Sequence, residues 1–266
     1  MTEYGDYNGL LNRVTQGDCL EVMRLIPDKS IDMILCDLPY GITRNKWDNV
    51  IDLDKLWEHY KRIIKDDGAI VLTASQPFTT KLISSNMSMF KYCWVWKKSQ
   101  VTGFLNAKKQ PLREHEDICV FYKKQCTYNP QMIVGKMQKK NTGGKSSNYN
   151  DFEAQPKTNN LYYPKTIIDI PLPRFKNGHP TQKPVALFEY LIRTYTNEGE
   201  VVLDNCIGSG TTAVAAINTN RQFIGIEREA KYVEIANKRI AEALERKTGG
   251  TSLFPWCTKD EGRKST

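Results

Sequence analysis

The sequence is poor in the residues that bind metals and cross-link secreted proteins. It has three histidines among 266 residues, and none of its seven cysteines forms a C-x-x-C pair. An odd number of cysteines in this pattern argues against a disulfide framework, and the few histidines give no support to a zinc site. We therefore expect a reduced, cytoplasmic protein that holds no metal.

Long hydrophobic runs are missing as well. The longest uncharged stretch runs from Asn205 to Asn220 and is rich in glycine, threonine and asparagine. It is shorter than the roughly 20 apolar residues that a membrane-spanning helix needs. The N-terminal residues MTEYGDYNGL contain no basic region followed by an apolar run, which is the pattern of a secretory signal. The sequence therefore predicts no membrane association.

Acidic residues are the minority among the charges. Lysine and arginine total 38 against 30 acids, which gives a net charge of +8, and the pI is about 9.0. A segment from Lys97 to Lys145 concentrates this excess, with eleven basic residues and three acids. The charge favours a polyanionic partner. The composition, with 40% hydrophobic and 26% charged residues, is that of a globular protein and excludes a disordered chain.

Short apolar strands alternate with amphipathic helices along most of the chain. Strands are predicted at residues 13–16, 31–36, 69–73, 92–96, 118–122, 201–204 and 223–226. Helices are predicted at residues 19–25, 53–64, 211–217 and 230–246, and two more are predicted to begin at Pro77 and at Pro184. Gly68 lies beyond the end of the predicted helix 53–64. This alternation predicts an α/β fold with a largely parallel sheet covered by helices on both faces. Residues 136–173 show little periodicity and indicate an irregular insertion.

A glycine-rich segment, Asp204 to Thr212, lies between a predicted strand and a predicted helix. Its glycines allow a ligand to approach the backbone, and Glu227 ends the next strand, where a carboxylate can bind ribose hydroxyls. Thr211 replaces the lysine that a phosphate-binding P-loop requires. The glycines also fit a dinucleotide site, but too few residues follow Glu227 for a second three-strand half. That half would have to come from the N-terminal part of the chain, in a circularly rearranged fold.

A second candidate site is the turn Asp37-Leu38-Pro39-Tyr40, at the carboxyl end of an apolar strand. A carboxylate, a turn carbonyl and an aromatic ring suit a planar heterocycle that carries an amino group. The same four letters are also typical of a type I turn with Tyr40 packed in the core.

Together, these motifs and their order resemble the beta arrangement of the amino-group DNA methyltransferases that use S-adenosylmethionine. The stretch from His179 to Pro184 is similar to the family's motif for the cofactor carboxylate, and Gly17-Asp18 looks like the turn near its adenine. The resemblance covers about Leu11 to Ile240 and implies a Rossmann-like, circularly permuted methyltransferase sheet. Leu38 stands where the most familiar form of the motif has proline, and the backbone carbonyl that the chemistry uses remains.

The resemblance assigns a role to each matching residue. Asp37 would hold the target amino group, the carbonyl of Leu38 or Pro39 would accept its second hydrogen, and Tyr40 would stack on the base. Asp204 would lie near the cofactor's ammonium, Thr181 and Lys183 near its carboxylate, Glu227 at the ribose and Asp18 at the adenine. The remaining cofactor-binding residues would be Cys206, Gly208, Ser209, Gly210, Thr211 and Thr212.

The basic segment would bind double-stranded DNA through its phosphates. The candidates are Lys97, Lys98, Lys108, Lys109, Arg113, Lys136, Lys139, Lys140 and Lys145. Interleaved aromatic residues could probe or wedge bases, namely Tyr128, Tyr149, Phe152, Tyr162 and Tyr163. The alternative is a solvated loop surface. The target base would be flipped out of the duplex into the pocket.

The predicted organisation has four parts. Residues 1–122 form the catalytic half, 123–176 a basic target-recognition insertion, 177–246 the cofactor-binding half and 247–266 a polar tail. The Asp-x-Pro-Tyr turn favours N6 of adenine, with N4 of cytosine as the alternative. RNA or protein methylation, a non-catalytic DNA-binding subunit and a dehydrogenase are weaker hypotheses. The sequence leaves open a homodimer and a cognate restriction endonuclease as partners.

Overall fold

A computed structural model describes residues 6–41, 50–140, 157–172 and 182–249. The strands are β1 (Arg13–Gln16), β2 (Ile31–Asp37), β3 (Ile64–Ala74), β4 (Phe90–Thr102), β5 (Arg113–Phe121), β6 (Ile133–Lys140), β7 (Lys157–Tyr162), β8 (Ile167–Asp169), β9 (Val201–Asp204) and β10 (Gln222–Glu227). The helices are α1 (Tyr7–Leu10), α2 (Cys19–Val22), α3 (Leu53–Ile63), α4 (Phe78–Ser85), α5 (Val185–Tyr195), α6 (Thr211–Asn218) and α7 (Ala230–Thr248), with 3₁₀ turns at Met23–Leu25 and Phe104–Asn106.

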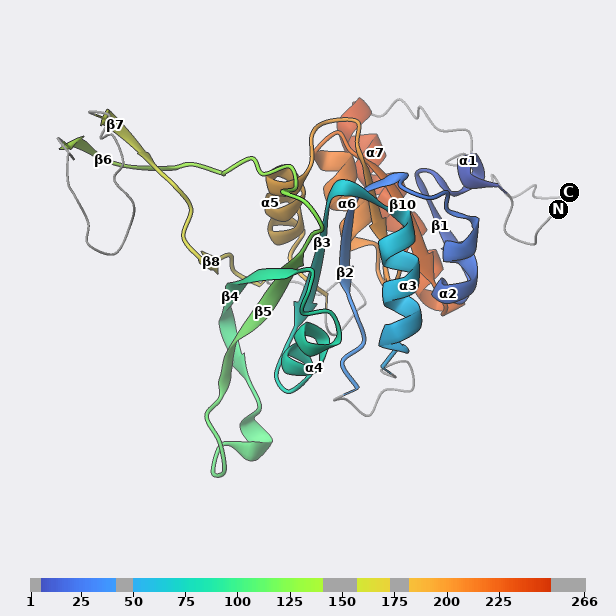
Figure 1. The fold of residues 1–266 in the computed structure, drawn as a ribbon, viewed down its shortest axis with the longest axis horizontal. Coiled ribbons are helices and arrows are strands. Elements are labelled where there is room, and N and C mark those ends of the chain that lie inside the picture. The colour runs from blue at the N-terminus through green and yellow to red at the C-terminus, as the bar shows by residue number, and fades with distance from the viewer. Residues whose placement is uncertain (1–5, 42–49, 141–156, 173–181, 250–266) are drawn as a thin grey trace, which may run out of the picture. The chain divides into compact units, whose positions relative to one another are not determined.

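Eight of these strands form one sheet in the order β1-β10-β9-β2-β3-β5-β4-β8 (Figure 1). The first five strands in this order are parallel, whereas β5 is antiparallel to both of its neighbours. The early and late parts of the chain meet twice, where β1 pairs with β10 and where β2 pairs with β9, with Met33 opposite Val202. The prediction of an α/β fold is confirmed. The circular permutation of the family order stays a prediction.

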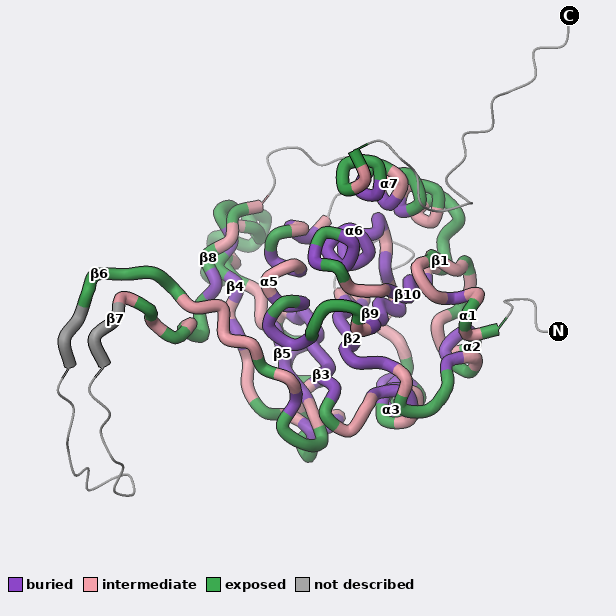
Figure 2. The backbone as a smooth tube through the Cα atoms, turned by 90° about the horizontal axis from the view of Figure 1, so that it is seen from above, coloured by how far each residue is buried: buried purple, intermediate pink, exposed green. Residues whose placement is uncertain are grey.

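The sheet separates two hydrophobic cores. Ile34 and Leu203 belong to the core that includes buried residues of α2, α3 and α4. Their neighbours Met33 and Val202 belong to the core that includes buried residues of α5, α6 and α7. Successive side chains of a strand point to opposite faces, so the continuous apolar run of β2 contributes to both cores. Figure 2 shows the central strands as the buried middle of this three-layer arrangement.

The helices are amphipathic, and α3 is the clearest case. Asp52 caps its N-terminus by accepting from the backbone N–H groups of Asp54 and Lys55, and its apolar side chains pack on the sheet. The chain passes directly from Ile63 into β3, so Gly68 does lie beyond the helix end, but within a strand and not in a helix cap. Gly68 lies within β3, where a Cβ atom would come 2.8 Å from the backbone oxygen of Asp32. Among the described residues, no helix has both the length and the apolar character needed to cross a membrane.

Strands β4 and β5 are longer than the sequence indicates. They continue past the sheet as a two-stranded arm that ends in the 3₁₀ turn Phe104–Asn106 (Figure 1). Most of the arm's residues are exposed and polar, so hydrophobic periodicity, which marks the buried parts of these strands, does not extend to its tip.

A second compact unit comprises Pro130–Lys165. In it β6 and β7 form an antiparallel pair, with Ile133 opposite Tyr162. Gly135 allows the Tyr162 ring to lie on the backbone, because a Cβ atom there would be 2.6 Å from the ring. The expectation of an irregular segment was therefore wrong for β6 and β7. The unit lies within the insertion expected at residues 123–176.

Gly225 lies in the middle of β10, and substituting it tests how tightly this strand packs against Ile207 of the glycine-rich loop. A Cβ atom at this position would lie 2.6 Å from Cδ1 of Ile207 and 3.1 Å from Cγ2 of Val14. We expect Gly225→Ala to lower the free energy of unfolding by about 1–3 kcal/mol, because the core would be overpacked. Urea denaturation measures the change.

Ile207→Val removes the clashing Cδ1 atom and provides the matched partner. The double variant should be less destabilised than the sum of the two single variants. Simple additivity, or a Gly225→Ala variant as stable as the parent, would show that Ile207 does not press on this strand.

Candidate active site

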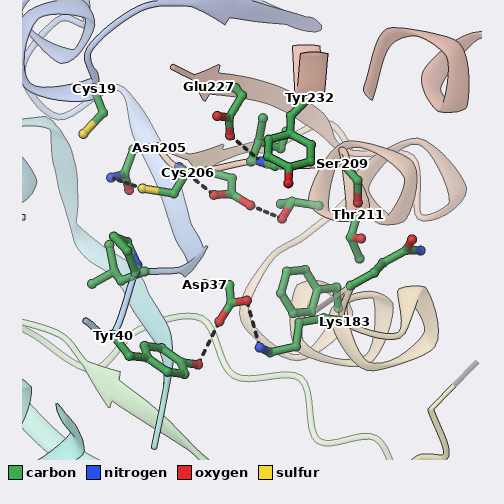
Figure 3. Close-up of a pocket in the computed structure, with 18 of the residues that line it drawn as sticks. Cys19, Asp37, Tyr40, Lys183, Asn205, Cys206, Ser209, Thr211, Glu227 and Tyr232 are labelled. Atoms are coloured by element: carbon green, nitrogen blue, oxygen red, sulfur yellow. Dashed lines mark hydrogen bonds and ion pairs between the residues drawn. The ribbon is translucent and has the colours of Figure 1, made fainter. Parts of the chain in front are cut away.

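A single cavity of about 470 Å³ opens at the carboxyl ends of β1, β2, β9 and β10. This is the edge at which open α/β sheets bind ligands, beside the point where strand order reverses. Within the described ranges, the cavity is lined by every catalytic and cofactor residue predicted from the sequence except Gly210: Asp18, Asp37, Leu38, Pro39, Tyr40, Lys183, Asp204, Cys206, Gly208, Ser209, Thr211, Thr212 and Glu227. Thr181 lies outside the described residues. Figure 3 shows how these side chains converge from several strands.

The glycine-rich loop is fixed by backbone conformations that glycine adopts readily. Gly208 and Gly210 have φ angles of 52° and 83°. Gly210 does not line the cavity; it packs against α7, where a Cβ atom would be 3.0 Å from Cα of Ala236. Helix α6 begins at Thr211, so the loop presents the first turn of a helix to the cavity. Such a turn carries N–H groups without helical partners and favours an anionic group.

Asp204 is a buried carboxyl group at the end of β9, only 3% exposed. It accepts hydrogen bonds from the backbone N–H of Cys206, at 3.0 Å, and from the hydroxyl of Thr212. Burial raises the pKa of Asp204 to about 7, although these hydrogen bonds oppose the shift. A cation that entered the cavity would therefore favour the ionised carboxylate.

Glu227, at the end of β10, orders the loop from the other side. Its two carboxylate oxygens accept from the backbone N–H groups of Gly208 and Glu229, each at 2.9 Å. Burial raises the pKa of Glu227 above its ordinary value. Each oxygen retains lone pairs, so the carboxylate can still accept hydrogen bonds from a pair of hydroxyl groups.

Arg239 supports the same loop and was not predicted. From α7 its Nη1 donates to the backbone oxygen of Ser209 at 2.6 Å, to the Ser209 hydroxyl at 2.9 Å and to the Thr211 hydroxyl at 3.3 Å. In the sequence Arg239 is one charged residue of an amphipathic helix. Only the packing of α7 against the loop distinguishes it from its neighbours.

Asp37 ends β2, and its side chain is 27% exposed. One carboxylate oxygen accepts from the Tyr40 hydroxyl, at 2.8 Å, and from the Thr73 hydroxyl. The other oxygen accepts from Nζ of Lys183 at 2.8 Å. The Tyr40 ring stacks on Phe78, with ring centroids 5.3 Å apart. Burial raises the pKa of Tyr40 well above its ordinary value, so its hydroxyl stays protonated and donates to Asp37.

Lys183 contacts the Asp37–Tyr40 turn itself. It is 8% exposed and lies between Asp37 and Glu116 of β5, whose Oε2 is 3.1 Å from its Nζ. Burial alone would lower the pKa of Lys183, but the carboxylates of Asp37 and Glu116 raise it above its ordinary value. Glu116 was not predicted as a site residue; it also lines the cavity.

The predicted DNA-binding residues fall into different environments. Lys97, Lys108 and Lys109 are exposed on the β4–β5 arm, and Arg113 lines the cavity. Lys98 differs from the expectation of a solvated basic surface: it is 7% exposed and pairs with Glu116 at 3.2 Å. The alternation of a strand turns Lys98 inward where Lys97 points outward.

The other basic and aromatic candidates lie in or beside the second unit. Lys136 of β6 is exposed, and β6 also contains Lys139 and Lys140. Tyr163 is exposed, the Tyr162 hydroxyl donates to the backbone oxygen of Lys136, and the Tyr128 ring packs against Tyr195 in the main unit. Lys145, Tyr149 and Phe152 lie outside the described residues.

Cysteines near the cavity have no sign of reactivity. Cys19 and Cys206 line it, with Cys36 buried behind them. Burial raises the pKa of Cys36 to about 12, so this thiol stays protonated at neutral pH. Within the described ranges, no three histidine, cysteine, aspartate or glutamate side chains are placed to hold a metal ion.

A family model described as DNA methylase matches residues 31–238 of the chain. Among curated proteins, the DNA adenine methyltransferase YhdJ of Escherichia coli K12 is 30% identical over 270 residues, which cover 90% of each chain. The type II methyltransferase M.HpaI of Haemophilus parainfluenzae is 26% identical over 249 residues, covering 86% of this chain and 74% of that protein.

Two solved structures extend the comparison. The crystal structure of the M1.HpyAVI–SAM complex is 25% identical, with a TM-score of 0.59 over 85% of this chain and 98% of that one. The cytosine-N4-specific PvuII DNA methyltransferase has a TM-score of 0.62 over 90% of this chain and 93% of that one. At 17% identity, the second structure is similar in fold alone.

The raised pKa of Asp204 predicts a pH-dependent stability. Between the ordinary value near 3.8 and about 7, the folded state holds a proton that the unfolded state has released. Folding is therefore favoured at low pH by this group, and the advantage is lost as pH rises through 7. Relative to Asp204→Asn, which cannot ionise, the parent should lose about 2 kcal/mol of unfolding free energy between pH 5 and pH 8.

Urea denaturation of both proteins at pH 5, 6, 7 and 8 measures the difference. Asp28→Asn, a substitution of an exposed carboxylate, is the control and should not reproduce this pH trend. If the unfolding free energies of the parent and of Asp204→Asn change equally with pH, burial does not raise the pKa of Asp204.

Proposed function

This chain belongs to the family of DNA methylases whose model spans residues 31–238, and from that premise we propose that it transfers a methyl group from S-adenosylmethionine to N6 of adenine in duplex DNA. The observation that carries the proposal is the opening of the Asp37–Tyr40 turn into the same cavity as the glycine-rich loop. The 30% identity to an enzyme named as a DNA adenine methyltransferase supports adenine as the target.

The cavity fits the chemistry of S-adenosylmethionine. When bound, this group would supply an electrophilic methyl on a sulfonium. Asp204 would hold its ammonium, Glu227 its ribose hydroxyls, and the backbone of Gly208 and Ser209 would pass along its methionine part. Asp18 would lie at the adenine edge; its carboxylate is fixed by accepting from the backbone N–H of Leu20 at 2.8 Å. A relative of 25% identity was solved with SAM bound.

Asp37 has the acceptor capacity that the reaction requires. An exocyclic amine is a poor nucleophile, because its lone pair is delocalised into the ring. Acceptors that draw its hydrogens out of the ring plane localise the lone pair on nitrogen. A carboxylate offers about four lone-pair sites, and Tyr40, Thr73 and Lys183 occupy three of them at Asp37. About one site is then left for an amino hydrogen, and the carbonyl of Leu38 or Pro39 would accept the other.

The remaining steps need positioning more than a strong base. The flipped base would stack on Tyr40. The methylated, ammonium-like product is acidic and releases its proton readily, so Asp37 need only orient and stabilise the developing positive charge. Cytosine N4 is the second candidate, since its amino group presents the same two hydrogens and the fold is shared with a cytosine-N4-specific enzyme.

The β4–β5 arm and the second unit would contact DNA phosphates. Lys97, Lys108 and Lys109 are exposed on the arm, and Lys136 is exposed on β6. Such contacts release counterions and make binding dependent on salt concentration.

Methyl transfer from labelled S-adenosylmethionine to unmethylated duplex DNA, with the digested product resolved by base, tests the function. We expect N6-methyladenine. Asp37→Ala should lower transfer by about 10³-fold, because the amino group loses its carboxylate acceptor, while calorimetry should show cofactor binding nearly unchanged. N4-methylcytosine would overturn the adenine assignment, and loss of cofactor binding in Asp37→Ala would count against the role given to Asp37.

Replacing Lys108 and Lys109 by glutamine tests the arm. Fluorescence anisotropy with a short duplex should give weaker binding and a slope of log K against log salt that is smaller in magnitude by about two. Lys238→Gln, an exposed lysine on α7, is the matched control and should leave the slope unchanged. An unchanged slope in the arm variant would remove these two lysines from the DNA interface.

A further inference from the structure

Four side chains of alternating charge form a chain of ion pairs that begins at Asp37 of the Asp37–Tyr40 turn. Asp37 of β2 contacts Lys183, Lys183 contacts Glu116 of β5, and Glu116 contacts Lys98 of β4, with N–O distances of 2.8, 3.1 and 3.2 Å. The two lysines are 8% and 7% exposed, and Glu116 is 15% exposed. All four side chains line the cavity. Figure 3 shows the ammonium of Lys183 directed at the carboxylate of Asp37 and away from the glycine-rich loop.

Stability alone does not account for this arrangement. Removing charges from water is costly, and well-packed apolar side chains often replace buried ion pairs without loss of stability. Here the charges lie at the open end of the sheet, next to the carboxylate that the reaction uses. A chain of this kind fixes the position of its last member, because each charge is held by the next.

We propose that Lys183 is a positioning residue for Asp37, held in place by Glu116 and Lys98, and not a ligand of the methyl donor's carboxylate. This inference rests on the proposed role of Asp37 in holding the target amino group. The Lys183 ammonium fixes one carboxylate oxygen, while the hydroxyl groups of Tyr40 and Thr73 fix the other. The base then meets a carboxylate of defined orientation with an acceptor site left.

The groups that face Asp37 set the expected pH dependence. They are Lys183, Glu116 of β5, Tyr40 of the same turn, Cys36 of β2 and Asp204 of β9. Among the described residues, Lys183 is the cation in direct contact with Asp37, and Glu116 and Asp204 are the neighbouring acids. Lys183→Gln removes the positive charge that stabilises the Asp37 carboxylate, and Glu116→Gln removes a negative charge that repels it. Two substitutions in one chain of contacts should therefore act in opposite directions.

Lys183→Gln and Glu116→Gln, assayed for methyl transfer to unmethylated bacterial chromosomal DNA from pH 5 to pH 9, provide the test. In Lys183→Gln we expect kcat to fall on the order of 100-fold, and the acidic limb of the profile to move to higher pH. In Glu116→Gln the acidic limb should move to lower pH. Lys183→Arg should restore much of the acidic limb, because it retains the charge.

Calorimetric affinity for S-adenosylmethionine separates the two roles of Lys183. Positioning of Asp37 predicts a Kd in Lys183→Gln within about threefold of the parent, whereas a ligand of the cofactor carboxylate predicts a much weaker Kd. A weakened Kd with an unmoved pH profile would overturn the inference. Lys65→Gln is the control, since it breaks another lysine–aspartate pair, with Asp32, at the opposite end of β2. It should leave the pH profile unmoved.

The role of Asp37, on which the proposal for Lys183 rests, is tested by a separate variant. Full activity in Asp37→Asn would remove the proposed role of Asp37, whatever Lys183 does. If Lys183→Gln does not fold, as judged by circular dichroism, Glu116→Gln decides the matter. A downward shift of its acidic limb supports the chain of charges, and an unmoved limb overturns it.

Discussion

The convergence of three carboxylates on one cavity is the constraint that organises this protein. Parallel strands β2, β9 and β10 end at the same edge, and each ends in an acid: Asp37, Asp204 and Glu227. Like charges this close repel one another, and each is partly removed from water. The surrounding structure must therefore compensate every one of them.

The groups that stabilise the negative charge differ from one acid to the next, and each set suits a different kind of ligand group. Asp37 is paired with the Lys183 ammonium, which holds one of its oxygens in place and leaves the carboxylate able to accept hydrogen bonds. Asp204 has hydrogen bonds but no ion pair with any described residue, and burial raises its pKa to about 7, so it is suited to a ligand that brings its own positive charge. Glu227 is held by two backbone N–H groups, which fix its orientation while lone pairs remain for hydroxyl groups.

Sequence reasoning located the three acids because their signals are local. An apolar run that ends in an acid marks the carboxyl end of a buried strand, and Gly208 and Gly210 mark a turn with positive φ angles. Two residues that support the site from other parts of the chain could not be found in the same way. Glu116 and Arg239 acquire their roles from contacts with segments distant in sequence. The strands β6 and β7 were missed because a mostly exposed pair of strands has no buried face to impose a period of two.

The cavity and the exposed basic residues also differ in how much of the fold depends on them. Asp37, Asp204 and Glu227 each lie at the end of a buried strand, so a change at any of them disturbs packing and charge balance together. The exposed lysines of the β4–β5 arm and of β6 contribute little to either hydrophobic core. Surface connections of this kind tolerate substitution far better than the elements they join. A protein built this way can change what its arm and second unit bind while the geometry around Asp37 stays fixed, because no charge in the arm's exposed tip compensates a carboxylate of the cavity.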